Sequence, residues 1–162
     1  MKRLAIAVTV LAIGAAGCGS SSTTKPSDNL VVFNVQLSAL NEVPPITNAE
    51  STARGTAVIT VDKVANTVDF SVSLRDFPAS ATVRVAHIHG PTGPAGATAG
   101  ILVDTLLAQG DVVLTNGAGT FSFEKRAASA AVIAGILANP QNHYFNVHTV
   151  LNGGGAIRGQ LQ

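Results

Sequence analysis

The chain has 162 residues, a formal net charge of +1 and 12% charged residues, a length that suits one domain. It has no basic cluster of the kind that binds nucleic acid, and we exclude that class of partner. With aromatic residues at 4%, no Trp, sixteen Gly and seven Pro, an aliphatic core with many turns is expected, which favours an all-β chain.

The N-terminus resembles a bacterial lipoprotein signal. Lys2 and Arg3 precede an apolar run, 4–13, that is too short to span a bilayer. Small residues follow, and then the only cysteine, Cys18. We expect residues 1–17 to be a signal peptide and Cys18 to carry the lipid that attaches an exported protein to the membrane. An ordinary secretory signal with an incidental cysteine is the alternative.

Residues 18–29 are polar and of low complexity, which predicts a flexible tether. The folded domain is expected at residues 30–162. By resemblance to known sorting behaviour, Gly19 after the cysteine favours the outer membrane, if the cell has one. The domain would then face the periplasm or the exterior.

Alternating apolar and polar residues predict that most of this domain is made of short strands. The Ala-rich segment 127–138 has helical spacing instead and should end at Asn139-Pro140. The simplest assembly is a Greek-key β-sandwich of seven or eight short strands with one short helix. The segments from which these seven or eight strands would form are 31–37, 56–62, 67–75, 82–89, 119–124, 143–150 and 156–161, with 101–107 and 111–115 as further short candidates.

Two histidines, His87 and His89, end the predicted strand 82–89. They share one face of an extended strand, with Cα atoms ~6.6 Å apart. His148 lies in another predicted strand. Because imidazole binds copper and zinc well, the three histidines predict a site for one metal ion, copper ahead of zinc, if they meet. Alternatively they are structural and donate hydrogen bonds to loop carbonyls.

Other polar residues could support such a cluster. Glu42 could complete a zinc site or accept an N–H from a ligating histidine, although a turn cap or an ion pair with Arg84 or Arg158 is the simpler interpretation. Asn146 is expected to be a buried hydrogen-bonding group. Arg158 is expected to be an ion-pair partner on a sheet face. His143 is expected to be exposed and without a role.

Three parts of the chain together resemble the chordin-type, or CHRD, domain. They are Leu-Asn-Glu-Val-Pro-Pro at 40–45, Ala-His-Ile-His-Gly-Pro at 86–91, and Tyr-Phe-Asn-Val-His-Thr at 144–149 with Ala-Ile-Arg-Gly-Gln-Leu at 156–161. The resemblance implies an extracytoplasmic β-sandwich module and leaves its biochemical activity open. Such domains occur in animal antagonists of secreted growth factors and in bacterial exported proteins.

The histidine pattern is also similar to that of copper/zinc superoxide dismutases. Those enzymes are Greek-key sandwiches with a His-x-His strand and a later histidine that bind copper. Here the loop after His89 has no histidine or acidic residue for zinc, and a single cysteine cannot form the disulfide within the chain. Arg158 is the candidate for guiding superoxide. The departures favour a copper site alone over a working dismutase.

Two main functional hypotheses follow. The first is a non-enzymatic, lipid-anchored binding module at the cell envelope that holds one copper ion, or zinc as the alternative, through His87, His89 and His148. The second is a protein-interaction or adhesion module, with an envelope or extracellular protein partner and structural histidines. A redox enzyme of dismutase type is the least favoured.

Overall fold

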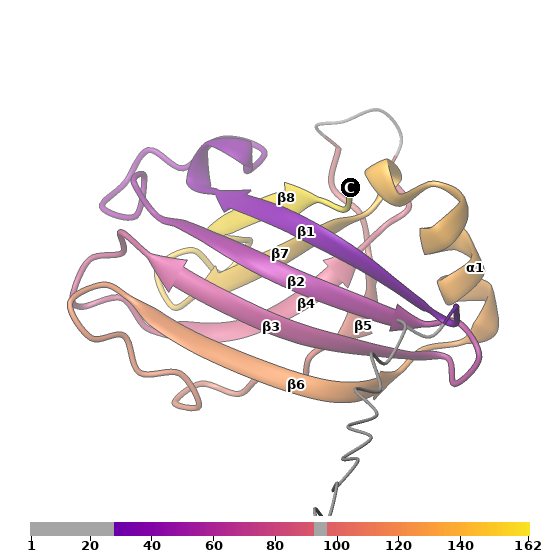
Figure 1. The fold of residues 1–162 in the computed structure, drawn as a ribbon. Coiled ribbons are helices and arrows are strands. Elements are labelled where there is room, and N and C mark those ends of the chain that lie inside the picture. Colours follow the sequence, from indigo (N-terminus) through magenta and orange to yellow (C-terminus); the bar gives the residue numbers. More distant parts are fainter. Residues whose placement is uncertain (1–27, 93–96) are drawn as a thin grey trace, which may run out of the picture.

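The computed structural model describes residues 28–92 and 97–162, so the predicted signal peptide, Cys18 and residues 18–27 of the tether lie outside the described residues. No helix in the described ranges is long and apolar enough to cross a membrane. These described residues form eight strands, one α-helix and two short 3₁₀ helices. Figure 1 shows how the elements are arranged. Their bounds are β1 (Leu30–Ser38), η1 (Ala39–Asn41), β2 (Arg54–Asp62), β3 (Thr67–Arg75), β4 (Val83–His89), β5 (Ile101–Asp104), β6 (Gly119–Ala127), α1 (Ala130–Ala138), η2 (Pro140–Asn142), β7 (Tyr144–Thr149) and β8 (Ile157–Gln160).

All neighbouring strands are antiparallel, in the order β5-β4-β7-β8-β1-β2-β3-β6. Figure 1 shows β1, β2, β3 and β6 as one layer, with β4, β5, β7 and β8 behind it. The layers join where β1 meets β8, through the single pair Ser38 and Arg158. The prediction of an all-β fold with seven or eight short strands and one helix is confirmed. Three of the strand pairs, β4–β7, β8–β1 and β3–β6, join strands that are not consecutive in the chain.

The core lies between the two layers and is built from the apolar half of each alternating strand. In the core Phe70 of β3 stacks on Phe145 of β7 with ring centroids 5.4 Å apart. Each fully buried aliphatic or Phe side chain stabilises the fold by roughly 1.5–3 kcal/mol. All six residues of β7 are buried, so the strand has a polar face that is covered as well as an apolar one.

Several sequence-based boundaries differ from those in the structure; the strand expected at 101–107, for example, ends at Asp104. The helix begins at Ala130 rather than at residue 127, because β6 continues to Ala127 and Ser129 caps the helix by accepting from Val132 N at 3.2 Å. The strand expected at 111–115 is absent. Only an isolated bridge between Thr115 and Ala118 forms there, closed by a turn at residues 116–117 with positive φ.

Gly159 marks the closest approach of β8 to β1, and we expect Gly159→Ala to lower the free energy of unfolding by roughly 3 kcal/mol. A Cβ at this position would lie 2.2 Å from the Gln36 carbonyl oxygen and 2.7 Å from Val35 Cγ1. Chemical denaturation measures the loss. The matched control is Gly154→Ala, whose Cβ would meet no atom within 4 Å; its effect should stay within about 0.5 kcal/mol. Equal effects of the two substitutions would contradict this account.

Candidate metal centre

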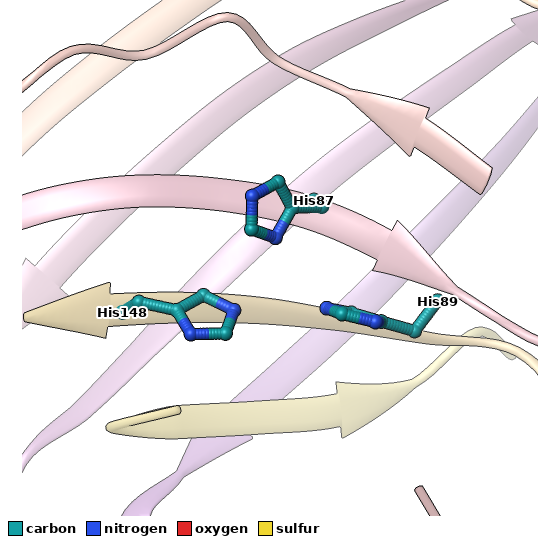
Figure 2. Close-up of side chains that lie close together, drawn as sticks. All are labelled: His87, His89 and His148. Carbon is teal, nitrogen blue, oxygen red and sulfur yellow. The ribbon is translucent and has the colours of Figure 1, made fainter. Parts of the chain in front are cut away.

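The register of β4 and β7 brings the three predicted histidines to one face of the sheet. His87 pairs with Asn146, and Val85 pairs with His148. Because directly paired residues point to the same side, His148 shares a face with His87 and His89. Figure 2 shows the three rings on one side of these strands, with the other layer behind them. The site is therefore on the outward face of this layer.

The three rings converge closely. Ring centroids lie 4.8 Å apart for His87 and His148, 5.3 Å for His87 and His89, and 5.8 Å for His89 and His148. One ring nitrogen from each residue lies within 4.8 Å of the others. Three nitrogens spaced evenly around one ion at ~2.1 Å lie at most about 3.6 Å apart, so each nitrogen would have to move inward by up to about 0.7 Å to close the group. The exposed fractions are only 5%, 8% and 6% for His87, His89 and His148.

In His89 and His148, a hydrogen bond to a loop carbonyl determines which of the two ring nitrogens is free. His89 Nδ1 lies 2.9 Å from the Ala99 carbonyl oxygen, and His148 Nδ1 lies 3.0 Å from that of Gly153. A carbonyl only accepts, so each Nδ1 carries the proton and each Nε2 keeps its lone pair. Both Nε2 atoms are buried without a partner in the described part of the chain, as is Nδ1 of His87.

Burial keeps the three imidazoles neutral. Desolvation lowers the pKa of His87 to about 4, helped by the nearby His148 and His89 and opposed by Asp104. Burial also lowers the pKa of His89 and of His148, against the hydrogen bonds that each ring makes to backbone carbonyls. A neutral imidazole is the form that binds a metal ion. At neutral pH all three rings therefore offer a lone pair.

Tyr144 and Arg158 hold the ring of His89 from one side. The Tyr144 ring stacks on His89 with centroids 4.9 Å apart and planes 7° from parallel. The guanidinium of Arg158 lies over Tyr144, 4.4 Å from its centroid. The Tyr144 hydroxyl accepts from Ala99 N at 3.2 Å, so Ala99 anchors both stacked rings.

Glu42 lies beside Asn146 rather than within the histidine group. It is 6% exposed, and its Oε1 is buried without a partner in the described residues. Burial raises its pKa to about 7, although Arg158 and a hydrogen bond from Asn146 both act to lower the pKa. Asn146 is buried as expected. The Arg158 Nε–H group donates to the Asn41 carbonyl oxygen at 2.7 Å and so connects the segment before Glu42 to β8.

His143 is buried, and the expectation that it is exposed is wrong. Only 3% of its surface is exposed, and its Nδ1 lies 2.9 Å from the Asn139 carbonyl oxygen. The ring fills space that Gly90 leaves open, because a Cβ on Gly90 would lie 2.3 Å from His143 Cδ2. The alternation of a strand could not reveal this contact, which depends on the φ of +152° at Gly90.

Glu50 is a buried residue that the sequence did not single out. It is 1% exposed and accepts hydrogen bonds from Thr149 Oγ1 at 2.7 Å and Asn152 Nδ2 at 2.6 Å. It therefore holds the loop after β7, in which Gly153 accepts from His148. Glu50 stands in a short polar turn with no motif around it, so no sequence signal marks it.

The fold and the site define an all-β protein with a buried group of three histidines that could hold a metal ion. Residues 33–161 match the family model of the CHRD domain, and the chain belongs to that family. Neither a curated protein nor a solved structure matches the chain. The family assignment confirms the resemblance seen in the three sequence motifs.

Glu42→Gln should stabilise the protein relative to wild type as the pH rises from 5 to 8. The folded chain binds a proton at Glu42 up to about pH 7, whereas an ordinary Glu releases it near 4.5. Stability from this group is therefore lost as the pH rises through 7. Urea unfolding should show a relative gain of up to about 3 kcal/mol for the variant. The exposed Glu124→Gln is the control, and a pH-independent difference for Glu42→Gln would contradict the prediction.

Proposed function

We propose that this protein is an exported, lipid-anchored binding module of the cell envelope that holds one copper ion through His87, His89 and His148. The observation that carries the proposal is that each of three clustered histidines has a buried ring nitrogen without a partner in the described residues and offers a nitrogen within 4.8 Å of the other two. A buried polar atom without a partner costs about 1–3 kcal/mol. One ion bound to all three nitrogens would remove that cost at each of them.

The donor set favours copper over zinc. Among divalent first-row metals copper binds nitrogen ligands most tightly. Structural zinc sites take four protein ligands, whereas the group in the described residues offers three. Glu42 contacts Asn146 and is not a member of that group, which weakens its case as a fourth ligand.

The protein-interaction hypothesis remains the alternative, because two of the histidines do bind loop carbonyls. Those bonds use Nδ1 and leave Nε2 free, so a structural role for each ring is compatible with metal binding. Dismutase activity is the least favoured reading, and superoxide consumption by the copper-loaded protein is the assay that would support it.

Titration with Cu(I), Cu(II) and Zn(II) tests the metal site. Tyr144 is the only tyrosine, and the chain has no Trp, so its fluorescence reports on the ring stacked against His89. We expect Cu(II) to quench this fluorescence at one equivalent and to bind more tightly than Zn(II). The double variant His87→Gln/His148→Gln should bind at least about a hundredfold more weakly, because two of three ligands are gone.

His143→Gln is the matched control for that titration. It replaces the fourth histidine, which is equally buried but is not part of the group, and should leave the affinity unchanged. Thermal unfolding of each variant checks that the fold persists. Equal affinities of the wild type and the double variant would sink the metal site and favour the protein-interaction hypothesis.

The anchor is tested separately by metabolic labelling with radioactive palmitate in a bacterial host. We expect the wild-type chain to be labelled and to fractionate with membranes, because Cys18 follows a signal-like segment and is the only cysteine. Cys18→Ser should abolish the label. Labelling that persists in this variant, or its absence from the wild type, would refute lipidation of Cys18.

A further inference from the structure

A cleft of about 400 Å³ lies between the turn that holds Glu50 and the loops at 78–82 and 150–151. Pro78, Val150 and Leu151 give it an apolar lining, and the last two are more than half exposed. None of the three clustered histidines lines it. Its volume is in the range of small-molecule sites. The cleft is thus a separate candidate for ligand binding.

Glu50 is one of the residues that line this cleft, and its carboxyl group forms no ion pair with a basic side chain of the described residues. The ion pair found in the described part of the chain joins Arg75 and Asp76, not Glu50. The two hydrogen bonds that Glu50 accepts, from Thr149 and Asn152, both go to Oε2 and leave Oε1 for a further donor. A glutamate that is 1% exposed is rare unless a positive charge or several donors compensate it.

We propose that the cleft binds a primary ammonium group on a short aliphatic chain. The ammonium donates to Glu50 Oε1, and the methylene groups lie against Pro78, Val150 and Leu151. A planar guanidinium prefers two carboxylate oxygens at once, whereas an ammonium suits the one oxygen that remains. A free alkylamine and the lysine side chain of another protein share this chemistry.

The test is an NMR titration of the protein with n-butylamine, using 1-butanol as the uncharged control of similar size. We expect the backbone amides of Ala81 and Val150 to shift, with a Kd on the order of 1 mM for so small a ligand. Butanol should bind at least about tenfold more weakly, because it lacks the charge. Absence of shifts at these amides, or equal binding of the alcohol, would overturn the proposal.

Glu50→Gln removes the charge and keeps an acceptor for Thr149 and Asn152, so it should weaken n-butylamine binding at least about tenfold. If Glu50→Gln does not fold, Leu151→Ser, a substitution of an exposed residue that lines the cleft, provides the test instead. It should weaken n-butylamine severalfold and leave methylamine, which has no chain to contact the leucine, unchanged. Wild-type affinity for n-butylamine in Leu151→Ser would also contradict the proposed pose.

Two further binding measurements identify the source of the amine and test whether the cleft binds it independently of the metal centre. Blocked lysine, N-acetyl-lysine amide, should bind more tightly than n-butylamine if the ligand is a protein lysine, and more weakly if it is a free alkylamine. The double variant His87→Gln/His89→Gln, which keeps His148 and its bond to the loop that lines the cleft, should bind n-butylamine as the wild type does. Loss of amine binding in that variant would contradict the independence of the two sites.

Discussion

The antiparallel register between β4 and β7 is the constraint on which the histidine group depends. A shift of one residue would turn His148 to the opposite face, because side chains alternate along a strand. The core residues that face the other layer, Ile88 of β4 and Phe145 of β7, form a direct pair and prevent such a shift. Burial of the apolar face thus aligns the polar face, and the three rings meet as a result.

Each clustered imidazole in contact with a loop uses only one of its two ring nitrogens in a hydrogen bond to that loop. On His89 and His148, Nδ1 binds a backbone carbonyl and sets the orientation of the ring. Nε2 then points into the buried centre without a partner in the described residues. A structural role for each ring is therefore compatible with metal binding, because the hydrogen bond at Nδ1 leaves Nε2 free. The lowered pKa of each ring also favours binding of a cation, because protons compete only weakly for the free nitrogens.

Local patterns predicted most of the strands. They also predicted that His87 and His89 lie on one face, since both features depend only on alternation along a strand. The position of His148 could not be derived this way, because β4 and β7 are far apart in the chain and their register follows from the assembled core. The burial of His143 depends on the backbone at Gly90, and that of Glu50 on contacts with Thr149 and Asn152. The segment at 111–115 has strand-like residues but lacks a neighbouring strand to pair with over its length.

The groups that orient His89 and His148 are the main-chain carbonyls of Ala99 and Gly153. A carbonyl is present whatever side chain the residue carries, so these two supports place little demand on the amino acid at either position. Homologous chains could therefore diverge in both loops and keep the same ring orientations. A search that requires a carboxylate next to each histidine would therefore miss histidine groups that are oriented in this way.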